Sequence, residues 1–103
     1  MIRATITDQA AIEQIKLDAL TAYLQRTGWT MRREPREGVC AWRAPREVLV
    51  RGLPRWWQIL PETDGVFADQ TDRVAEAIAM IAALEDRSQL DVFVDLGGDL
   101  HAT

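Results

Sequence analysis

The sequence predicts a single α+β domain: two long helices, a three-stranded antiparallel meander between them, and a short C-terminal element. The chain has 103 residues, of which 48% are hydrophobic, and both values fit one folded domain (1–103) with one core. Apolar residues recur at helical spacing near both ends of the chain. Short β-favouring runs, divided by proline and glycine, occupy the middle.

Residues 8–27 are predicted to form the first helix, with Asp8 as its N-cap. Two apolar rows run along this helix, which is typical of a helix covered on more than one side. The rows contain Ile12, Ile15, Leu17, Ala19, Leu20, Ala22, Tyr23 and Leu24. The helix is expected to stop at Gly28, because glycine suits the left-handed position that follows a helix.

The middle of the chain favours three antiparallel strands, at residues 29–34, 39–43 and 47–51. Turns are expected at 35–38, which contains proline and glycine, and at 44–46, which contains proline. If one face of this meander meets solvent, its arginines belong on that face.

Residues 52–65 are predicted to be an irregular, tryptophan-rich segment. Pro54 suits the start of a helical turn at 55–60. The segment contains the adjacent pair Trp56 and Trp57. Adjacent side chains point in different directions, so one core does not easily bury both rings.

A second long helix is expected to begin near residue 69 or 71 and to end near 87. Alanine is frequent in it, which raises helix propensity and permits close packing. Its apolar face contains Val74, Ala77, Ile78, Ile81 and Leu84.

Residues 89–96 fit two structures. Strict apolar alternation favours a strand, whereas Ser88 and Asp91 match a capping box and favour a helix. A short helix closed by glycines at 97 and 98 is the preferred interpretation. Residues 99–103 are expected to be a flexible tail.

Charge is divided along the chain. The formal net charge is −4 at pH 7. Residues 26–55 carry eight arginines against three glutamates, a net charge of +5, and residues 62–99 carry ten acids against two arginines, a net charge of −8. The overall acidity argues against a nucleic-acid partner.

Residues with metal-binding or nucleophilic chemistry are few and scattered. The only cysteine, Cys40, falls in a predicted strand, and the only histidine, His101, falls in the tail. Asp91 and Asp95 have the i,i+4 spacing of a cation site, but an acidic helix surface is a commoner reason for that spacing. We therefore expect no catalytic residues, no metal and no cofactor.

The expected cellular location rests on two sequence features that are missing, a membrane-spanning run and a secretory signal. No apolar run approaches the ~20 residues that span a bilayer, and the start of the chain lacks the pattern of a secretory signal. A single cysteine also fits a reducing compartment. A cytoplasmic protein without membrane contact is expected.

The four tryptophans divide into two pairs. Trp29 and Trp42 lie on predicted strands and are expected in the core. For Trp56 and Trp57 two interpretations stay open: a partner-binding surface, or one buried ring beside one ring at the edge of the core. Tryptophan next to arginine is the composition of interface hot spots. The partner-binding set would be Arg51, Arg55, Trp56 and Trp57.

The arginine-rich meander is a second candidate surface. A basic ribbon can enter a DNA groove or contact an acidic protein, although a solvated face is the simplest interpretation. This alternative basic face contains Arg32, Arg33, Arg36, Arg43 and Arg46.

A sequence layout runs through most of the chain. It comprises Tyr23-Leu24, Gly28-Trp29, Asp72-Arg73-Val74, Glu76-Ala77-Ile78, Glu85, Arg87-Ser88, Leu90 and Val92. The layout, YLxxxGW … DxxxRVxEAI … ExRSxLxV, resembles a widespread group of uncharacterised bacterial proteins over residues 17–96. The resemblance implies bacterial origin and the order of elements, and it implies no activity. Relative to that group the chain inserts residues 51–66, a reasonable place for a specific function.

The sequence therefore predicts a non-enzymatic protein-interaction module. It would act as a regulator, inhibitor or complex subunit of a bacterial or mobile-element system, and would bind a partner protein through residues 51–59. A homodimer through the same surface is an equal alternative. A nucleic-acid-associated protein that uses the arginine-rich meander is the other alternative.

Overall fold

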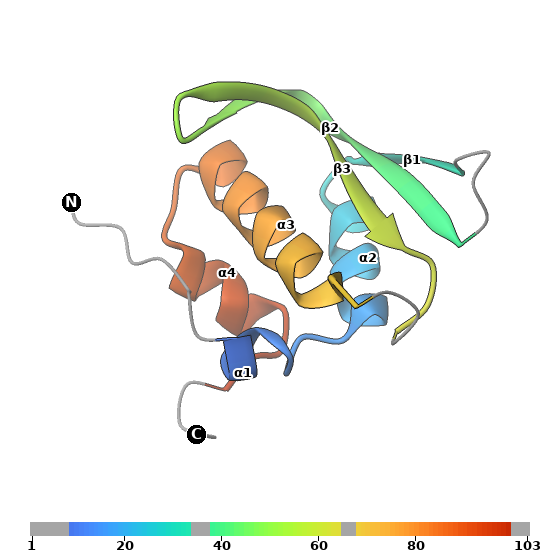
Figure 1. Cartoon of the computed structure of the whole chain (residues 1–103). Coiled ribbons are helices and arrows are strands. Elements are labelled where there is room, and N and C mark those ends of the chain that lie inside the picture. Colours follow the sequence, from blue (N-terminus) through green and yellow to red (C-terminus); the bar gives the residue numbers. More distant parts are fainter. Residues whose placement is uncertain (1–8, 34–37, 65–67, 100–103) are drawn as a thin grey trace.

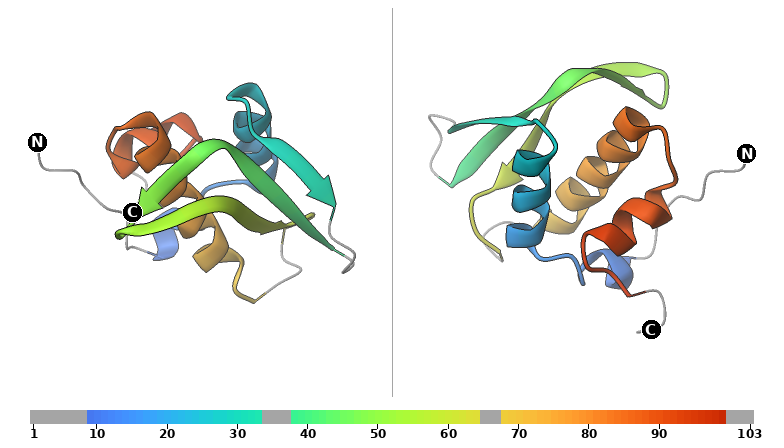
Figure 2. Two further views of the ribbon diagram at one scale, coloured as in Figure 1. Left: turned by 90° about the horizontal axis from the view of Figure 1, so that it is seen from above. Right: turned by 180° about the vertical axis from the view of Figure 1, so that it is seen from behind.

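The sheet and the helices form two layers. A computed structural model of the chain describes residues 9–33, 38–64 and 68–99. The elements are α1 (Gln9–Ile12), α2 (Leu17–Arg26), β1 (Thr30–Arg33), β2 (Val39–Val50), β3 (Leu53–Pro61), α3 (Gln70–Glu85) and α4 (Gln89–Asp95). The strands pair antiparallel in the order β1-β2-β3. The described helices lie on one side of the sheet (Figures 1 and 2), so they leave the other side, here called the outer face, uncovered.

This arrangement confirms the predicted α+β class. A helical start, a three-stranded meander, a long helix and a short C-terminal helix follow one another in the expected order. Within the described ranges, no helix combines the length and the apolar character needed to cross a membrane.

The helix predicted over residues 8–27 is in fact two helices. Residues 13–16 form a turn, and Lys16 has an extended backbone with φ −81° and ψ 138°. One straight helix would point the two apolar rows in different directions. The turn instead lets α1 pack on α3 while α2 packs beside β1. Ile12 and Ile15 are buried as a result.

The end of α2 lies where the sequence predicts it. Gly28 has φ 94°, in the left-handed region that glycine adopts readily. The amide of Trp29 donates to the carbonyl of Leu24 at 2.9 Å, which completes a Schellman-type helix end. Trp29 then turns into the core, where it is 4% exposed, as is Trp42 from β2. The prediction that both rings are core residues is confirmed.

The second strand is longer than predicted. The turn expected at 44–46 lies inside β2. Arg43 pairs with Trp57 and Val48 pairs with Arg55, so four residues of β2 stand opposite one residue of β3. The proline in this segment is accommodated because the ladder of hydrogen bonds is already interrupted at the bulge.

The prediction that residues 52–65 are irregular or helical is wrong for most of them. They form β3, and the strand predicted at 47–51 is the end of β2. The connection is a two-residue turn, in which Arg51 has φ 53° and Gly52 has φ 77°. Two successive positive φ angles are the mark of a type I′ hairpin turn. Pro54 follows on an edge strand, where proline is tolerated because a missing N–H can face away from the sheet.

Helix α3 covers the inner face of the sheet and confirms the second long helix of the prediction. Its buried residues are Val74, Ala77, Ile78, Met80, Ile81 and Ala82. Gln58 of β3 is fully buried against it. The Gln58 amide donates to the carbonyls of Ile59 at 3.0 Å and of Arg73 at 3.4 Å. This buried polar group is therefore satisfied, and it ties β3 to α3.

Of the two structures that the sequence allows for residues 89–96, the helix is the one observed, as α4. Ser88 caps it, because its Oγ accepts a hydrogen bond from the amide of Leu90 at 3.2 Å. Beyond the helix the amide of Gly98 donates to the carbonyl of Phe93 at 2.9 Å. A Cβ atom at Gly98 would collide with the buried Phe93 ring, so the close approach requires glycine.

Some predictions fall outside the described residues. These are the Asp8 cap, most of the turn at 35–38, and residues 100–103 of the tail. The first tail residue, Asp99, is described, and its amide donates to Oε1 of Gln14 at 2.9 Å.

Candidate functional site

The outer face of the sheet carries alternate residues of all three strands. Gln58 and its partner Trp42 face the helices, because Gln58 reaches α3 and Trp42 is buried. Side chains alternate along a strand, so the neighbouring pair, Arg43 and Trp57, faces outward. The same alternation places Arg32 of β1 on the outer face.

Two arginines and two tryptophans stack on this face. The guanidinium carbon of Arg43 lies 4.8 Å from the ring centroid of Trp56 and 5.6 Å from that of Trp57. The guanidinium carbon of Arg32 lies 5.0 Å from the ring centroid of Trp57. These distances fall within the range of cation–π attraction. We call Arg32, Trp57, Arg43 and Trp56 the arginine–tryptophan ladder.

A small residue makes the ladder continuous. Strand β2 lies between β1 and β3, so the contact between Arg32 and Trp57 has to cross β2. At the crossing β2 presents Ala41, which pairs with Arg32 on one side and with Ile59 on the other. Ala41 is only 1% exposed although the described helices lie on the other face. Its outward neighbours therefore cover it, and its methyl group leaves the room they need.

The bulge of β2 positions the outer end of the ladder. Trp56 is the residue of β3 that stands opposite the bulge. Its indole Nε1 donates to Oε2 of Glu47 at 3.0 Å, and the residue stays 38% exposed. Bulges commonly re-aim side chains in this way. Trp57 is half-buried, so neither ring of the pair is a core residue.

The hydrogen-bonding groups of Arg43 have no acceptor among the described residues. Its side chain is exposed, and within the described part of the chain its contacts are the two tryptophan rings and no carboxylate. Stacking uses the flat faces of a guanidinium and leaves its N–H groups in the plane between them.

The ladder unites residues from both sets that the sequence proposed. Trp56 and Trp57 come from the tryptophan-rich segment, and Arg32 and Arg43 come from the basic meander. Sequence reasoning missed Glu47 and Ala41, which complete the surface. Strand alternation could have shown that Ala41 and Arg43 share a face, but the bulge that brings Glu47 to Trp56 leaves no comparable pattern.

Other proposed residues serve the fold. Arg55 turns to the helix side, where its Nη2 donates to the Trp57 carbonyl at 3.1 Å and to Gln58 Oε1 at 3.2 Å. Arg46 donates to the carbonyl of Leu84 at 2.6 Å, at the C-terminal end of α3, where a positive charge is favourable.

The remaining arginines of the two sets lie apart from the ladder or outside the description. Arg51 is exposed in the hairpin turn. The side chain of Arg33 and all of Arg36 lie outside the described part of the chain.

A second polar cluster joins α2, α3 and α4. The hydroxyl of Tyr23 donates to both carboxylate oxygens of Glu85, at 2.7 and 2.6 Å. Arg87 donates to the Tyr23 oxygen at 2.8 Å and to Glu85 Oε1 at 2.7 Å, and pairs with Asp95 at 2.7 Å. We call Tyr23, Glu85, Arg87 and Asp95 the interhelical cluster.

The interhelical cluster shifts two pKa values. Burial raises the pKa of Tyr23 above 10.0, and the hydrogen bond to Glu85 raises it further, against a lowering by Arg87. Burial alone would lower the pKa of Arg87, but the hydrogen bonds to Glu85, Asp95 and Tyr23 raise it overall.

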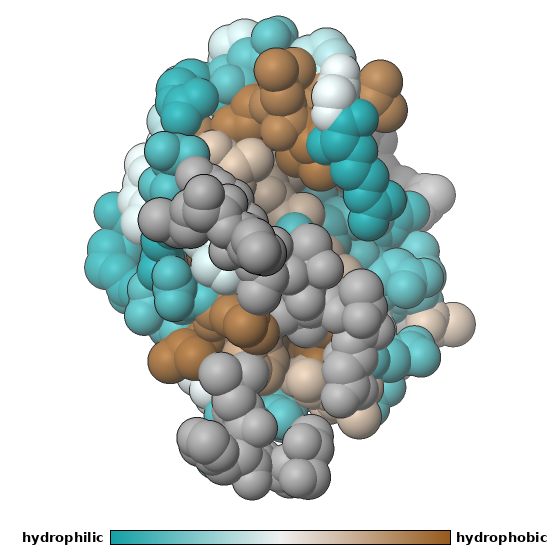
Figure 3. Space-filling model, turned by 90° about the vertical axis from the view of Figure 1, so that its left-hand side faces the viewer, coloured by the Kyte–Doolittle hydropathy of each residue, from teal (hydrophilic) through white to brown (hydrophobic). Residues whose placement is uncertain are grey.

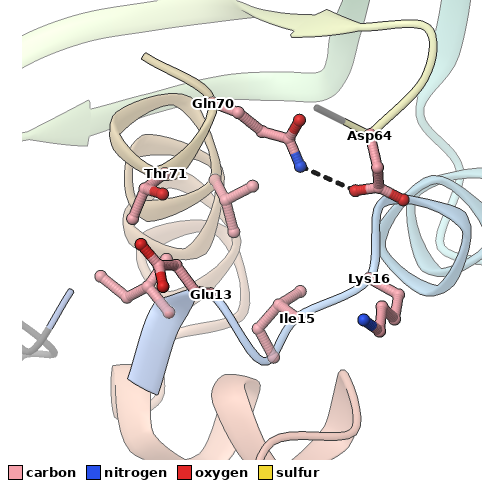
Figure 4. A pocket seen from close by; sticks show the side chains of 8 residues that line it. Glu13, Ile15, Lys16, Asp64, Gln70 and Thr71 are labelled. Carbon is pink, nitrogen blue, oxygen red and sulfur yellow. Dashed lines mark hydrogen bonds between the residues drawn. The ribbon is translucent and has the colours of Figure 1, made fainter. Parts of the chain in front are cut away.

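A shallow polar cleft of about 260 Å³ lies between the turn after α1 and the start of α3 (Figure 4). Both apolar and polar side chains line it. The amide of Gln70 donates to Asp64 Oδ1 at 2.7 Å, so two of its polar groups already bind each other. The lining residues are Ile12, Glu13, Ile15, Lys16, Asp64, Gln70, Thr71 and Val74.

Metal-binding chemistry is sparse in the described residues. They contain no group of three or more His, Cys, Asp or Glu side chains that could hold a metal ion. Cys40 is buried, with its sulfur 3.7 Å from Oε1 of Glu62. Asp95, one of the pair with cation-site spacing, is paired with Arg87.

No protein-family model, curated protein or solved structure matches the chain.

Proposed function

We propose that the protein is a non-enzymatic interaction module that binds a partner protein through the outer face of its sheet. Arg32, Arg43, Trp56 and Trp57 are the contact residues of this proposal. It would act in the cytoplasm as a regulator, an inhibitor or a subunit of a complex. The single observation that carries it is the arginine–tryptophan ladder, on the sheet face that the described helices leave uncovered.

The composition of the ladder supports a protein partner. Tryptophan and arginine are the residues most enriched in the energetic centres of protein interfaces. Their rings and stems supply a large apolar area, and their polar ends supply direction. A sheet face that served only as a solvated surface would not need two large aromatic rings.

An apolar side chain extends the surface toward the end of the β2–β3 hairpin, where Leu49 of β2 is 64% exposed. Leu53 is 66% exposed, but it pairs with Val50, which packs against the core, so it lies on the helix side of the hairpin. Figure 3 views the molecule from the left of Figure 1 and shows hydrophobic residues gathered near its top, where the β2–β3 hairpin ends. Leu49 follows the buried Val48 on β2, so it points outward on the side of the ladder.

The hydrogen bonds at the free edge of β3 favour a partner that docks on the outer face of the sheet over a partner that adds a strand to its edge. The amide of Glu62 donates to the carbonyl of Gly38 at 2.9 Å, so even-numbered residues at this end of β3 bond to β2. The backbone groups of Trp57 and Ile59 therefore point to the open edge. Both carbonyls already accept hydrogen bonds from side chains, of Arg55 at 3.1 Å and of Gln58 at 3.0 Å. A partner strand would have to displace them.

Site-specific photo-crosslinking in cells tests the proposal. A benzophenone amino acid is placed at Leu49, which flanks the ladder, and in a control at Val94, which is 49% exposed on α4. We expect a covalent adduct with one partner protein from position 49 and none from position 94. Arg43→Gln should abolish the adduct, and Lys16→Gln, which removes the same charge beside the polar cleft, should leave it.

The result that would overturn the proposal is equally specific. Equal adducts from positions 49 and 94, or no adduct from position 49, would show that the outer face is not the binding surface. Circular dichroism of Arg43→Gln confirms that the variant is folded.

A further inference from the structure

We infer that the arginine–tryptophan ladder recognises an acidic segment of its partner, with an Asp or Glu carboxylate bound by the in-plane N–H groups of Arg43. This inference rests on the proposed function and adds the chemistry of the partner to it. The occupant is a protein segment that presents carboxylates together with apolar side chains.

The first step is the orientation of Arg43. Its guanidinium stacks on Trp56 and Trp57, at 4.8 and 5.6 Å, and makes no hydrogen bond or ion pair with a described residue. A guanidinium is flat and carries five N–H donors in its plane. These donors have no acceptor among the described residues, and a planar carboxylate matches the edge of a guanidinium with two parallel hydrogen bonds.

The second step is preorganisation. A free arginine side chain loses rotamer entropy when a partner fixes it. In the ladder the two rings already restrict Arg43 before any partner arrives. Stacking also replaces part of the water around the guanidinium, so less hydration has to be removed on binding. Arg43 is therefore better prepared for an anion than an isolated surface arginine.

The third step is the distribution of charge. Arg32 adds a second positive charge to the ladder through its contact with Trp57. Among the described residues, Glu47 brings a carboxylate to the ladder, and the indole of Trp56 donates to it. The helices carry exposed acids at Asp72, Asp86 and Asp91. An acidic segment is thus repelled by the helical side and attracted to the sheet face.

The ladder suits carboxylates better than nucleic acid. Proteins that bind single strands offer aromatic faces on which bases stack. In this protein, arginines already lie over both rings, which reduces the aromatic surface left for a base. The net charge of −4 also opposes a polyphosphate chain.

The test selects random short peptides displayed on phage with the full-length protein, after removal of peptides that bind the Arg43→Gln variant. We expect the selected peptides to be enriched in Asp and Glu. A synthetic selected peptide should shift the NMR signals of the Trp56 and Trp57 indoles. Its counterpart with Asn and Gln in place of the acids should bind about tenfold more weakly.

Matched variants locate the interaction. Arg43→Gln should weaken binding of the acidic peptide about tenfold, as expected for loss of a charge-assisted hydrogen bond. Lys16→Gln loses the same charge on the helical side and should bind like the wild type. NMR spectra of both variants report whether they keep the fold.

Several results would overturn the inference. Selected peptides that shift the same indole signals but lack acids would show that the surface is right and its partner chemistry is wrong. Tighter binding of oligothymidylate at the same signals would favour nucleic acid, and concentration-dependent self-association abolished by Arg43→Gln would favour a second copy. A failure to select any peptide would also overturn it. Failure of the crosslink at position 49, by contrast, rejects the proposed function itself.

Discussion

Two clusters in this protein place an arginine beside an aromatic side chain. They differ in whether the N–H donors of that arginine already have acceptors within the protein. In the interhelical cluster Arg87 bonds to Tyr23, Glu85 and Asp95, so its donors meet protein acceptors. In the arginine–tryptophan ladder Arg43 lies over two tryptophan rings, and its donors meet no described carboxylate.

The difference separates a structural arginine from a binding one. The side chains of Arg87 and Glu85 are only 26% and 24% exposed, and they join the ends of three helices. Removing one partner there leaves buried charge without compensation. Arg43 is exposed and belongs to one sheet face, so the fold loses little without it. The position of the hydrogen-bond acceptors, more than the type of ring, distinguishes the two roles.

The largest expected effect is on the interhelical cluster. Arg87→Gln should lower the free energy of unfolding by about 2 to 3 kcal/mol, because Glu85 and Tyr23 lose a charged partner in a largely buried site. Arg43→Gln should lower it by at most about 1 kcal/mol, the loss of an exposed cation–π contact. Urea denaturation measures both values. Equal losses would remove the distinction between the two clusters.

A second prediction uses the pH dependence of the interhelical cluster. Tyr23 is the only tyrosine, so the absorbance of tyrosinate reports this group alone. Burial and Glu85 raise its pKa in the folded protein above the ordinary 10.0. The folded protein therefore holds the phenol proton more tightly than the unfolded chain. The resulting stabilisation is complete below pH 10.0 and is lost as the pH rises through the folded value.

Two measurements check this prediction. The absorbance titration should have a higher midpoint in buffer than in concentrated urea. Tyr23→Phe should cost about 1 to 2 kcal/mol near neutral pH, since Glu85 loses a hydrogen bond. The difference in stability between this variant and the wild type should shrink at high pH. A midpoint equal to or below that in urea would contradict the assignment.

The second long helix, α4 and the core could be predicted from the sequence because their signals are local, whereas the break between α1 and α2 was missed. Apolar spacing marked the second long helix, Ser88 marked the start of α4, and Gly28 marked the end of α2. Trp29 and Trp42 lay in β-favouring runs with apolar neighbours and are core residues. Each of these predictions depends on a few adjacent residues.

The strand predictions failed where the pairing between neighbouring strands decides the structure. Pro45 indicated a turn, but a bulge opposite Trp56 accommodates it inside β2. Pro54 and the two adjacent tryptophans indicated an irregular segment, but an edge strand tolerates the proline, and the bulge of β2 leaves both rings beside Arg43 on the outer face. The sequence-based prediction assigned the members of the ladder to two different candidate surfaces, because strand pairing could not be read from the sequence. Only the pairing of β2 with β3 brings Arg43 to Trp57.

A third prediction concerns a substitution that should disrupt the ladder although all four of its residues are kept. Ala41→Leu should fill the space over β2 and separate the Trp57 ring from Arg32. We expect a loss of about 1 kcal/mol in unfolding free energy, at the low end for added volume, because the ring can move into solvent. NMR should show loss of the ring-current shift on the Arg32 side chain, together with weaker peptide binding. Unchanged Arg32 signals would show that Ala41 is not the spacer.

The smallest expected effect is at Arg51, which sits in the hairpin turn with φ 53°. Arg51→Asn should raise the unfolding free energy by about 0.5 kcal/mol, because asparagine tolerates the left-handed region and Asn-Gly is the favoured pair in type I′ turns. The variant also removes one positive charge near the exposed end of the hairpin and leaves the ladder intact. Binding of the acidic peptide should therefore stay within about twofold of the wild type, as expected for an unpaired surface charge. If binding falls as far as it does in Arg43→Gln, the general positive charge of this region is what attracts the partner, and stacking gives Arg43 no special role.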